Sequence, residues 1–370
     1  MSAKVVARLA VALFATAAIV VSLQQLEGAS EGVRVSRARV GSIPVTAFAP
    51  EGGAPGERRP VVVIAHGFAG SQQLMLPQAL TLARHGYLAL TFDFPGHGRN
   101  AVPMAGGIVD FAASTRALLE ALGEVAGAAR AWPGSDGRLA LLGHSMASDI
   151  VIRRGMGDAA VQATVALSAY SPTVTATSPR NLLIVDGALE PRMLHDEGLR
   201  IVGLAQGGAP ALAGRTYGDF ATGSARRFAL ARGVEHISVL YSRDALRESL
   251  DWIDRSFGRP ARSTSPLLDA RGPWLGLLCL GIVALAWPLA ALLPRAVRVA
   301  PAAASAAMRP GSSSAPEVAA GAAARESAAS REVLGRGAGA AVAREASMHE
   351  GSLLQRREAL LVAQRDGDEA

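Results

Sequence analysis

The segment Gly143–Ala147, with the sequence GHSMA, contains the serine best placed to act as a nucleophile. An apolar run, Arg138–Leu142, precedes this segment and a helix-like stretch follows it, so we predict a strand, a sharp turn and a helix. Small residues two positions before and after Ser145 suit a strained turn that exposes a hydroxyl. Ala147 departs from the G-x-S-x-G pattern at its last position. The alternative interpretation is that Ser145 is an ordinary helix N-cap.

A glycine-containing loop follows an earlier apolar run, Val61–Ala65, and could supply hydrogen-bond donors to a reacting carbonyl oxygen. It begins with His66, Gly67 and Phe68. The backbone N–H of Phe68 and that of Met146 are the candidate donors of an oxyanion hole. The next predicted strand leads into a turn that contains Asp93 and His97, which we interpret as structural residues.

These segments, in this order, are similar to the landmarks of serine hydrolases of the α/β-hydrolase fold. The resemblance extends from residue 60 to about residue 257. It implies a mainly parallel central sheet flanked by helices, with Ser145 as nucleophile. It further implies an acid after a later strand and a histidine nearer the end of the domain, in the chain order Ser, Asp or Glu, His. Such an enzyme requires no metal and no organic cofactor.

Two acids are candidates for the orienting carboxylate. Family members commonly carry this acid three residues beyond a glycine at the turn after a late strand, which corresponds to Glu190 after Gly187. Its role would be to accept the imidazole N–H and to stabilise the imidazolium. Asp186, at the end of the predicted strand Asn181–Val185, is the competing candidate.

Two histidines are candidates for the base, because the others lie in the motifs above, before a strand or in the C-terminal tail. His195 follows Glu190 by five residues on a predicted helix. His236 follows the stretch Arg226–Arg232 and precedes the last helix, as expected of the loop after a final strand. We therefore assign the base to His236, with a surface or structural histidine as the alternative.

The implied chemistry is cleavage of an ester or amide through an acyl-enzyme on Ser145, with His236 as base. A carboxylic ester, of a small molecule or of a lipid, is the first expectation for the substrate, and a peptide the second. The alternative function is a non-catalytic binding module of a membrane protein, because a fold does not fix a function. Only Tyr170–Arg180 separates two predicted strands. We therefore expect an open site, or one covered by a helix-like region over Ala205–Phe220.

Short β-branched runs alternate with Ala- and Leu-rich stretches between residues 33 and 257, which predicts an α/β fold. The predicted strands are Val33–Val40, Ile43–Ala49, Val61–Ala65, Tyr87–Phe92, Arg138–Leu142, Val161–Leu167 and Asn181–Val185. The predicted helices are Gln73–His85, Asp110–Arg130, Met146–Gly155, Arg192–Leu204 and Tyr241–Phe257.

Two apolar runs outside this domain predict membrane helices. The first follows Lys4 and Arg8 and has the charge order of a signal anchor or a signal peptide, between which we favour the retained anchor. The second covers residues 273–294 and is long enough to cross a bilayer. Arg295 follows the second run, so the positive-inside bias would place both outer flanks in the cytoplasm and the catalytic domain in the periplasm or outside the cell.

Composition excludes some function classes and completes the predicted domain organisation. Arginines are scattered among acids, so we expect no nucleic-acid partner, and the single cysteine allows no intrachain disulfide. Residues 295–370 are poor in large apolar side chains and predict a low-complexity, disordered tail or a partner-binding helix near residues 353–362. The predicted division is a signal segment (1–26), a catalytic domain (27–258), a linker (259–272), a transmembrane helix (273–294) and this tail.

Overall fold

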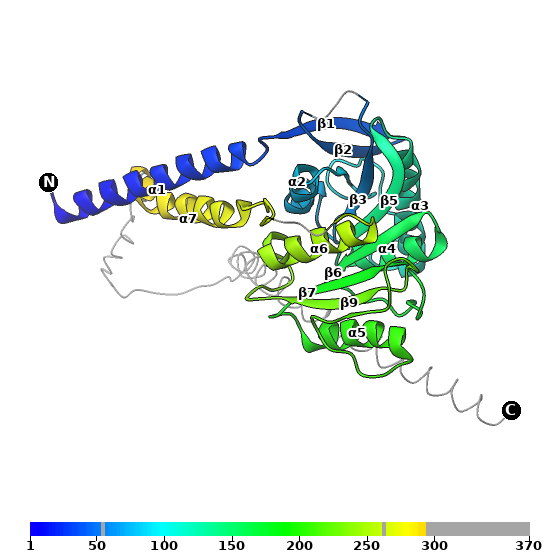
Figure 1. Ribbon diagram of the computed structural model, residues 1–370. Helices are drawn as coiled ribbons and strands as arrows, with labels where there is room; N and C mark the ends of the chain where they lie inside the picture. The colour runs from blue at the N-terminus through cyan, green and yellow to red at the C-terminus, as the bar shows by residue number, and fades with distance from the viewer. Residues whose placement is uncertain (53–55, 261–263, 294–370) are drawn as a thin grey trace, which may run out of the picture. The chain divides into compact units, whose positions relative to one another are not determined.

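The structure is a computed structural model that describes residues 1–52, 56–260 and 264–293. In this part of the chain, a nine-stranded sheet has the order β1-β2-β4-β3-β5-β6-β7-β9-β8 (Figure 1). The strands are β1 (Val33–Val40), β2 (Ile43–Pro50), β3 (Arg59–Ala65), β4 (Leu88–Phe92), β5 (Ser135–His144), β6 (Val161–Leu167), β7 (Leu182–Gly187), β8 (Thr216–Tyr217) and β9 (Arg226–Ala231).

Helices cover both faces of this sheet. The α-helices are α1 (Ala3–Gly28), α2 (Leu76–Arg84), α3 (Phe111–Arg130), α4 (Met146–Gly157), α5 (Arg192–Gly203), α6 (Arg243–Ser256) and α7 (Arg271–Leu289). Short 3-10 helices are η1 (Gln72–Met75), η2 (Leu204–Gln206), η3 (Ser238–Tyr241) and η4 (Ala290–Leu292).

The six central strands of the sheet, β4, β3, β5, β6, β7 and β9, are parallel, and antiparallel strands flank them at both edges. The central strands are apolar on both faces because both faces are covered. On β3, Val62 and Ile64 pack in the core under α2 and α6, whereas Val61 and Val63 pack in the core under α3 and α4. The predicted α/β-hydrolase-type fold is confirmed.

Strands and helices form at the predicted ranges, with differences at several ends. The strand before Ser145 begins at Ser135, three residues earlier than predicted, and the first predicted helix, Gln73–His85, divides into η1 and α2. The expected helical cover over Ala205–Phe220 is wrong. After η2, Gly207 and Gly208 adopt positive φ angles, which end the helical path, and the chain continues to β8 at the sheet edge.

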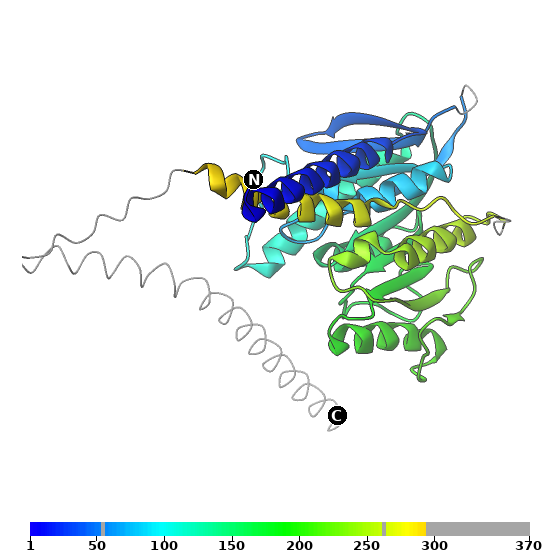
Figure 2. The same ribbon diagram turned by 90° about the vertical axis from the view of Figure 1, so that its left-hand side faces the viewer.

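The two terminal helices α1 and α7 lie side by side in an antiparallel pair (Figures 1 and 2). Gly281 of α7 packs so closely on α1 that an added Cβ would lie 2.9 Å from Ile19 Cγ1 and 3.0 Å from the Ala15 carbonyl oxygen. Near the start of α1 and the end of α7, the Arg8 guanidinium lies over the Trp287 ring. Both helices have the length and hydropathy of a membrane span, and large apolar side chains on both face outward.

The segment before α7 is hydrogen-bonded to the α/β domain. The Leu267 N–H donates to His85 Nε2, and the Asp269 N–H donates to Thr81 Oγ1 on α2. The Arg84 guanidinium, at the end of α2, donates to the carbonyl oxygen of Ala29, directly after α1. The predicted tail, residues 295–370, lies outside the described residues.

Candidate active site

Ser145 occupies the turn between β5 and α4 in a strained backbone conformation. Its φ is 54° and its ψ is −118°, and its N–H donates to the carbonyl oxygen of Leu167 at 2.9 Å. A Cβ added to Gly143 would lie 2.5 Å from the Ala147 carbonyl oxygen, so the position before the turn requires glycine. The Ala147 methyl instead packs in the core. This difference explains why alanine fits the last position of the motif.

A continuous chain of hydrogen bonds joins three of the residues predicted from the sequence. His236 Nε2 lies 2.8 Å from Ser145 Oγ, and His236 Nδ1 lies 2.5 Å from Glu190 Oε1. Ser145 follows β5, Glu190 follows β7 and His236 follows β9. Because these strands are parallel, their carboxyl ends meet at one edge of the sheet and bring the three side chains together.

Glu190 is fixed by donors on its second oxygen. Glu190 Oε2 accepts from the Gly187 N–H at 2.6 Å and from the Ser168 hydroxyl at 3.1 Å. Burial raises the pKa of Glu190, but the hydrogen bonds from His236, Gly187 and Ser168 outweigh it, so the pKa lies below its usual value. The Glu190 hydrogen bond raises the pKa of His236 against the opposing effect of burial. The pair therefore favours a carboxylate beside an imidazole that readily accepts a proton.

Asp186, the competing acid, is buried at the end of β7 without the same partners. Its Oδ1 accepts a long hydrogen bond of 3.4 Å from the Ala169 N–H, and its Oδ2 has no hydrogen-bond partner among the described residues. Burial, together with the charge of Glu190, raises the pKa of Asp186 to about 7. The carboxylate hydrogen-bonded to His236 is thus that of Glu190.

The two candidate oxyanion donors belong to segments that adjoin Ser145. A Cβ added to Gly67 would lie 3.1 Å from Ser145 Cβ, so the loop that carries Phe68 adjoins the serine. In the described part of the chain, the Phe68 N–H has no backbone acceptor. Met146 is the first residue of α4, where an N–H has no acceptor within the helix. Both amides are available to an external oxygen.

The residues interpreted as structural hold the loops around the site. The Asp93 carboxylate accepts from the amides of Gln72 and Arg99, which ties three loop segments together. His97 Nδ1 lies 2.9 Å from the Pro95 carbonyl oxygen. His66 Nε2 accepts from the Phe94 N–H, so its Nδ1 carries the proton and donates to the Gly67 carbonyl. Burial lowers the pKa of His66 to about 4, so this imidazole stays neutral.

Two supporting residues were not singled out from the sequence. His144, beside the serine, donates from Nε2 to the His236 carbonyl oxygen at 2.8 Å, and burial lowers the pKa of His144 to about 4. Ser168 donates to Glu190 from the end of β6. The signal for Ser168 was a polar residue at the carboxyl end of a strand next to β5. His195, the alternative base, instead lies 2.9 Å from the Gly187 carbonyl oxygen.

The short connection between β6 and β7 is bound to the domain. The Ser171 hydroxyl donates to Asp149 Oδ1 on α4, and the Ser171 N–H donates to Glu197 Oε1 on α5. Arg200 donates to the Ser171 carbonyl and pairs with Glu197. These contacts hold the connection against α4 and α5.

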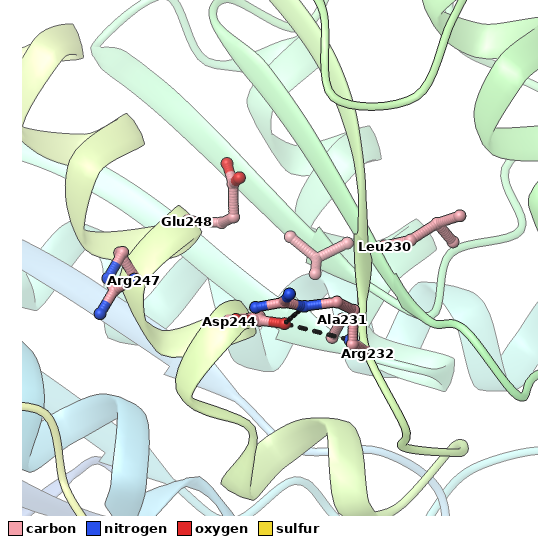
Figure 3. Close-up of a pocket in the computed structure, with 7 residues that line it drawn as sticks. Leu230, Ala231, Arg232, Asp244, Arg247 and Glu248 are labelled. Carbon is pink, nitrogen blue, oxygen red and sulfur yellow. Dashed lines mark hydrogen bonds and ion pairs between the residues drawn. The ribbon is translucent and has the colours of Figure 1, made fainter.

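A hollow separate from the hydrogen-bonded chain lies between β9 and α6 (Figure 3). In it, the Arg232 side chain and N–H both bind the Asp244 carboxylate, and Arg247 and Glu248 extend from α6. Its lining contains no serine, cysteine or histidine, so it offers no nucleophile. Among the residues that the structure describes, no group of three or more His, Cys, Asp or Glu side chains is placed to hold a metal ion.

The fold and the site define a protein of the α/β-hydrolase type, and a comparison with known families agrees. Residues 56–186 match the family described as serine aminopeptidase S33. The match includes the Ser145 turn and ends before Glu190 and His236. It supports a hydrolase of the α/β fold. No curated protein matches the chain significantly.

Solved structures also resemble the chain. TT1662 from Thermus thermophilus is 18% identical, with a TM-score of 0.46, and the alignment covers 62% of this chain and 99% of that one. The predicted CIB-like hydrolase from Thermoplasma acidophilum is 16% identical, with a TM-score of 0.43, and the alignment covers 60% of this chain and 98% of that one.

Proposed function

We propose that this protein is a membrane-anchored serine hydrolase that cleaves an ester or amide bond through an acyl-enzyme on Ser145. The observation that carries the proposal is the hydrogen-bonded chain from Ser145 Oγ through His236 to Glu190. A helix N-cap serine needs no such chain, and Ser145 makes no side-chain cap hydrogen bond to α4. The strained turn adds support, because it costs stability that a purely structural serine would not require.

Each proposed residue has a defined role in the reaction. His236 Nε2 takes the proton of Ser145 as Oγ bonds to the carbonyl carbon, and the amides of Phe68 and Met146 stabilise the negative oxygen. The bond to the leaving group then breaks as the imidazolium gives it the proton. Water, deprotonated by His236, releases the acyl group and frees Ser145. Glu190 holds the imidazole in the required tautomer throughout.

The substrate is proposed to be a carboxylic ester, with a peptide as the second candidate. The match to a serine aminopeptidase family is the observation that favours the second. Glu235, beside His236, accepts one hydrogen bond on each oxygen, from the Ile237 and Ser238 amides, and these contacts stabilise the turn after His236. An activity screen over acyl esters of graded chain length and aminoacyl amides separates the two candidates.

Membrane anchoring is proposed from α1 and α7. Their antiparallel pairing brings Arg8 beside Trp287, so the two outer flanks lie at the same end of the pair. This arrangement supports a topology with both flanks on one side of the membrane and the catalytic domain on the other. Lys4 and Arg8 favour the cytoplasm as the side of the flanks. Proteolysis of intact spheroplasts would then reach the catalytic domain and spare residues 295–370. Protection of both parts would contradict the topology.

The test of the nucleophile is labelling of the folded full-length protein with a fluorophosphonate probe. We expect labelling that is lost in Ser145→Ala and retained in Ser42→Ala, a serine in the exposed turn between β1 and β2. Circular dichroism verifies that both variants are folded. If labelling of the parent protein is absent or independent of Ser145, the non-catalytic binding module becomes the better account.

A further inference from the structure

Large apolar side chains are exposed beside several of the proposed site residues. Leu189, which precedes Glu190, is 67% exposed, and Ile237, which follows His236, is 48% exposed. Phe68, whose amide is a candidate oxyanion donor, is 57% exposed. Single exposed apolar residues are common on proteins, but several of them around one site indicate a surface that meets an apolar partner.

The connection between β4 and α3, together with the first residue of α3, adds three more such residues. Ile108, Val109 and Phe111 are exposed, Val109 to 88%. These six residues, Phe68, Ile108, Val109, Phe111, Leu189 and Ile237, are called the apolar rim below.

Contacts between loops show how the rim is arranged around Ser145. The Phe68 ring packs edge-on against the His97 ring, and the neighbouring Gly96 N–H donates to the Val102 carbonyl, at the start of the segment that carries Ile108 and Val109. On the other side, the Leu189 N–H donates to the Val234 carbonyl, in the loop that leads to Ile237. Phe68 and Leu189 thus connect the rim to two loops that adjoin the proposed catalytic residues.

The rim lies close to the start of a proposed membrane helix. Gly272, in the first turn of α7, packs against Tyr241, and an added Cβ there would lie 3.1 Å from Tyr241 Cβ. Tyr241 belongs to η3, which begins two residues after His236. The hydrogen bonds of Leu267 and Asp269 to α2 leave no loose spacer directly before α7. A helix that enters the bilayer at α7 thus holds the site close to the lipid headgroups.

Exposed cations accompany the apolar side chains. Arg99 is exposed in the turn that packs against Phe68. Arg192, two residues after Glu190, has a side chain that is 91% exposed and lies 3.6 Å from the Asp196 carboxylate. Apolar side chains together with arginines are the combination that binds the interface of a membrane containing anionic lipids.

We propose that the apolar rim docks on the lipid bilayer and that the substrate is the acyl ester of a membrane lipid, which reaches Ser145 directly from the bilayer. The inference rests on the proposed function, because the ester is cleaved by the same serine. The acyl chain would pass between the two sides of the rim, while the ester carbonyl meets the Phe68 and Met146 amides.

Docking is tested first without turnover, in full-length protein reconstituted in vesicles of phosphatidylcholine with phosphatidylglycerol. An environment-sensitive fluorophore is attached through Val109→Cys in a Cys279→Ser background, where it is the sole thiol. We expect a blue-shifted emission and quenching by brominated lipids. The matched control is Leu212→Cys, also exposed, which lies near Tyr217 and the amino end of β9. Emission from position 109 equal to that from position 212 would overturn the docking.

Substrate class is tested with two esters, a long-chain acylglycerol in the vesicle bilayer and a water-soluble short-chain ester. The combined variant Ile108→Ser, Val109→Ser, Phe111→Ser should lose about ten-fold or more of its activity on the bilayer ester and less than about two-fold on the short one. Leu212→Ser should change neither. Equal losses on both esters, or none on the bilayer ester, would contradict the inference. If neither ester is cleaved in a Ser145-dependent manner, the proposed function fails instead, and the fluorescence still reports docking.

Discussion

The carboxyl edge of the sheet is held by buried hydrogen bonds, whereas the α1–α7 pair is held by apolar packing. At the sheet edge, Glu190 is buried and its two oxygens receive hydrogen bonds from His236, Gly187 and Ser168. Between the helices, Gly281 packs against apolar α1, and large apolar side chains face outward. The structure of the sheet edge depends on the identity of single donor and acceptor atoms, because buried charges need hydrogen-bond partners. That of the helix pair depends on volume, because close helix packing needs small residues.

The test with the largest expected effect replaces one carboxylate oxygen at the sheet edge by an amide nitrogen. Glu190→Gln keeps the shape but places an amide where His236 Nδ1 needs an acceptor, so the imidazole loses its orientation. We expect kcat/KM for an ester to fall about 10³- to 10⁴-fold. Asp186→Asn is the matched control, because this acid is four residues away and has no hydrogen bond to His236 among the described residues, and its loss should stay below about ten-fold. The reverse ranking would reassign the orienting acid to Asp186.

The pH dependence tests the same contact with a smaller effect. A base must be neutral to act, so activity rises with pH through the pKa of His236, which Glu190 raises above the usual 6.5. The acid limb of the kcat/KM profile should therefore lie above pH 6.5. In the residual activity of Glu190→Gln the limb should move to lower pH, since the carboxylate that stabilises the imidazolium is gone. A limb that does not move would show that another group controls it.

The third test increases the side-chain volume between α1 and α7. Gly281→Leu would place a side chain where an added Cβ already lies 2.9 Å from Ile19, so α1 and α7 must separate. We expect a loss of about 1–3 kcal/mol in the stability of the detergent-solubilised protein, measured by thermal unfolding. Gly276→Leu is the control on the same helix, because nothing lies within 4 Å of a Cβ there. Activity of Gly281→Leu on a short soluble ester should stay within about two-fold of the parent; a larger loss would show that the pair also shapes the site.

The two regions also differ in what could be predicted from sequence. The strands were predicted because continuous apolar runs such as Val61–Ala65 indicate central parallel strands, and Ser145 was found because its turn imposes small residues at fixed spacing. The helical cover over Ala205–Phe220 was wrong, because Gly207 and Gly208 adopt positive φ angles that end the helical path after η2. Choosing Glu190 over Asp186 relied on a family resemblance, since the two acids differ in partners that only the fold brings together.

The supporting contacts were beyond sequence reasoning for a related reason. Ser168 and Glu190 are 22 residues apart, and His144 meets the His236 carbonyl across 92 residues. Hydrophobic periodicity defines elements but carries no information on which hydroxyl meets which carboxylate. The pairing of α1 with α7 was likewise unforeseen, although the apolar length of each helix was evident.

The smallest expected effect concerns Asp186, the buried acid with one long hydrogen bond. Because the pKa of Asp186 is raised to about 7 in the folded chain, the unfolded chain releases this proton first as the pH increases above 3.8. Asp186 therefore lowers stability progressively between pH 4 and pH 7, and the full loss is present above pH 7. Asp186→Asn resembles the protonated acid at every pH. In thermal unfolding, this variant should be as stable as the parent near pH 4. Near pH 8 it should be more stable than the parent, on the order of a few kcal/mol at most. A gain that is equal at both pH values would show that Asp186 does not titrate in this range, and that its burial alone, without charge, limits the stability of this edge.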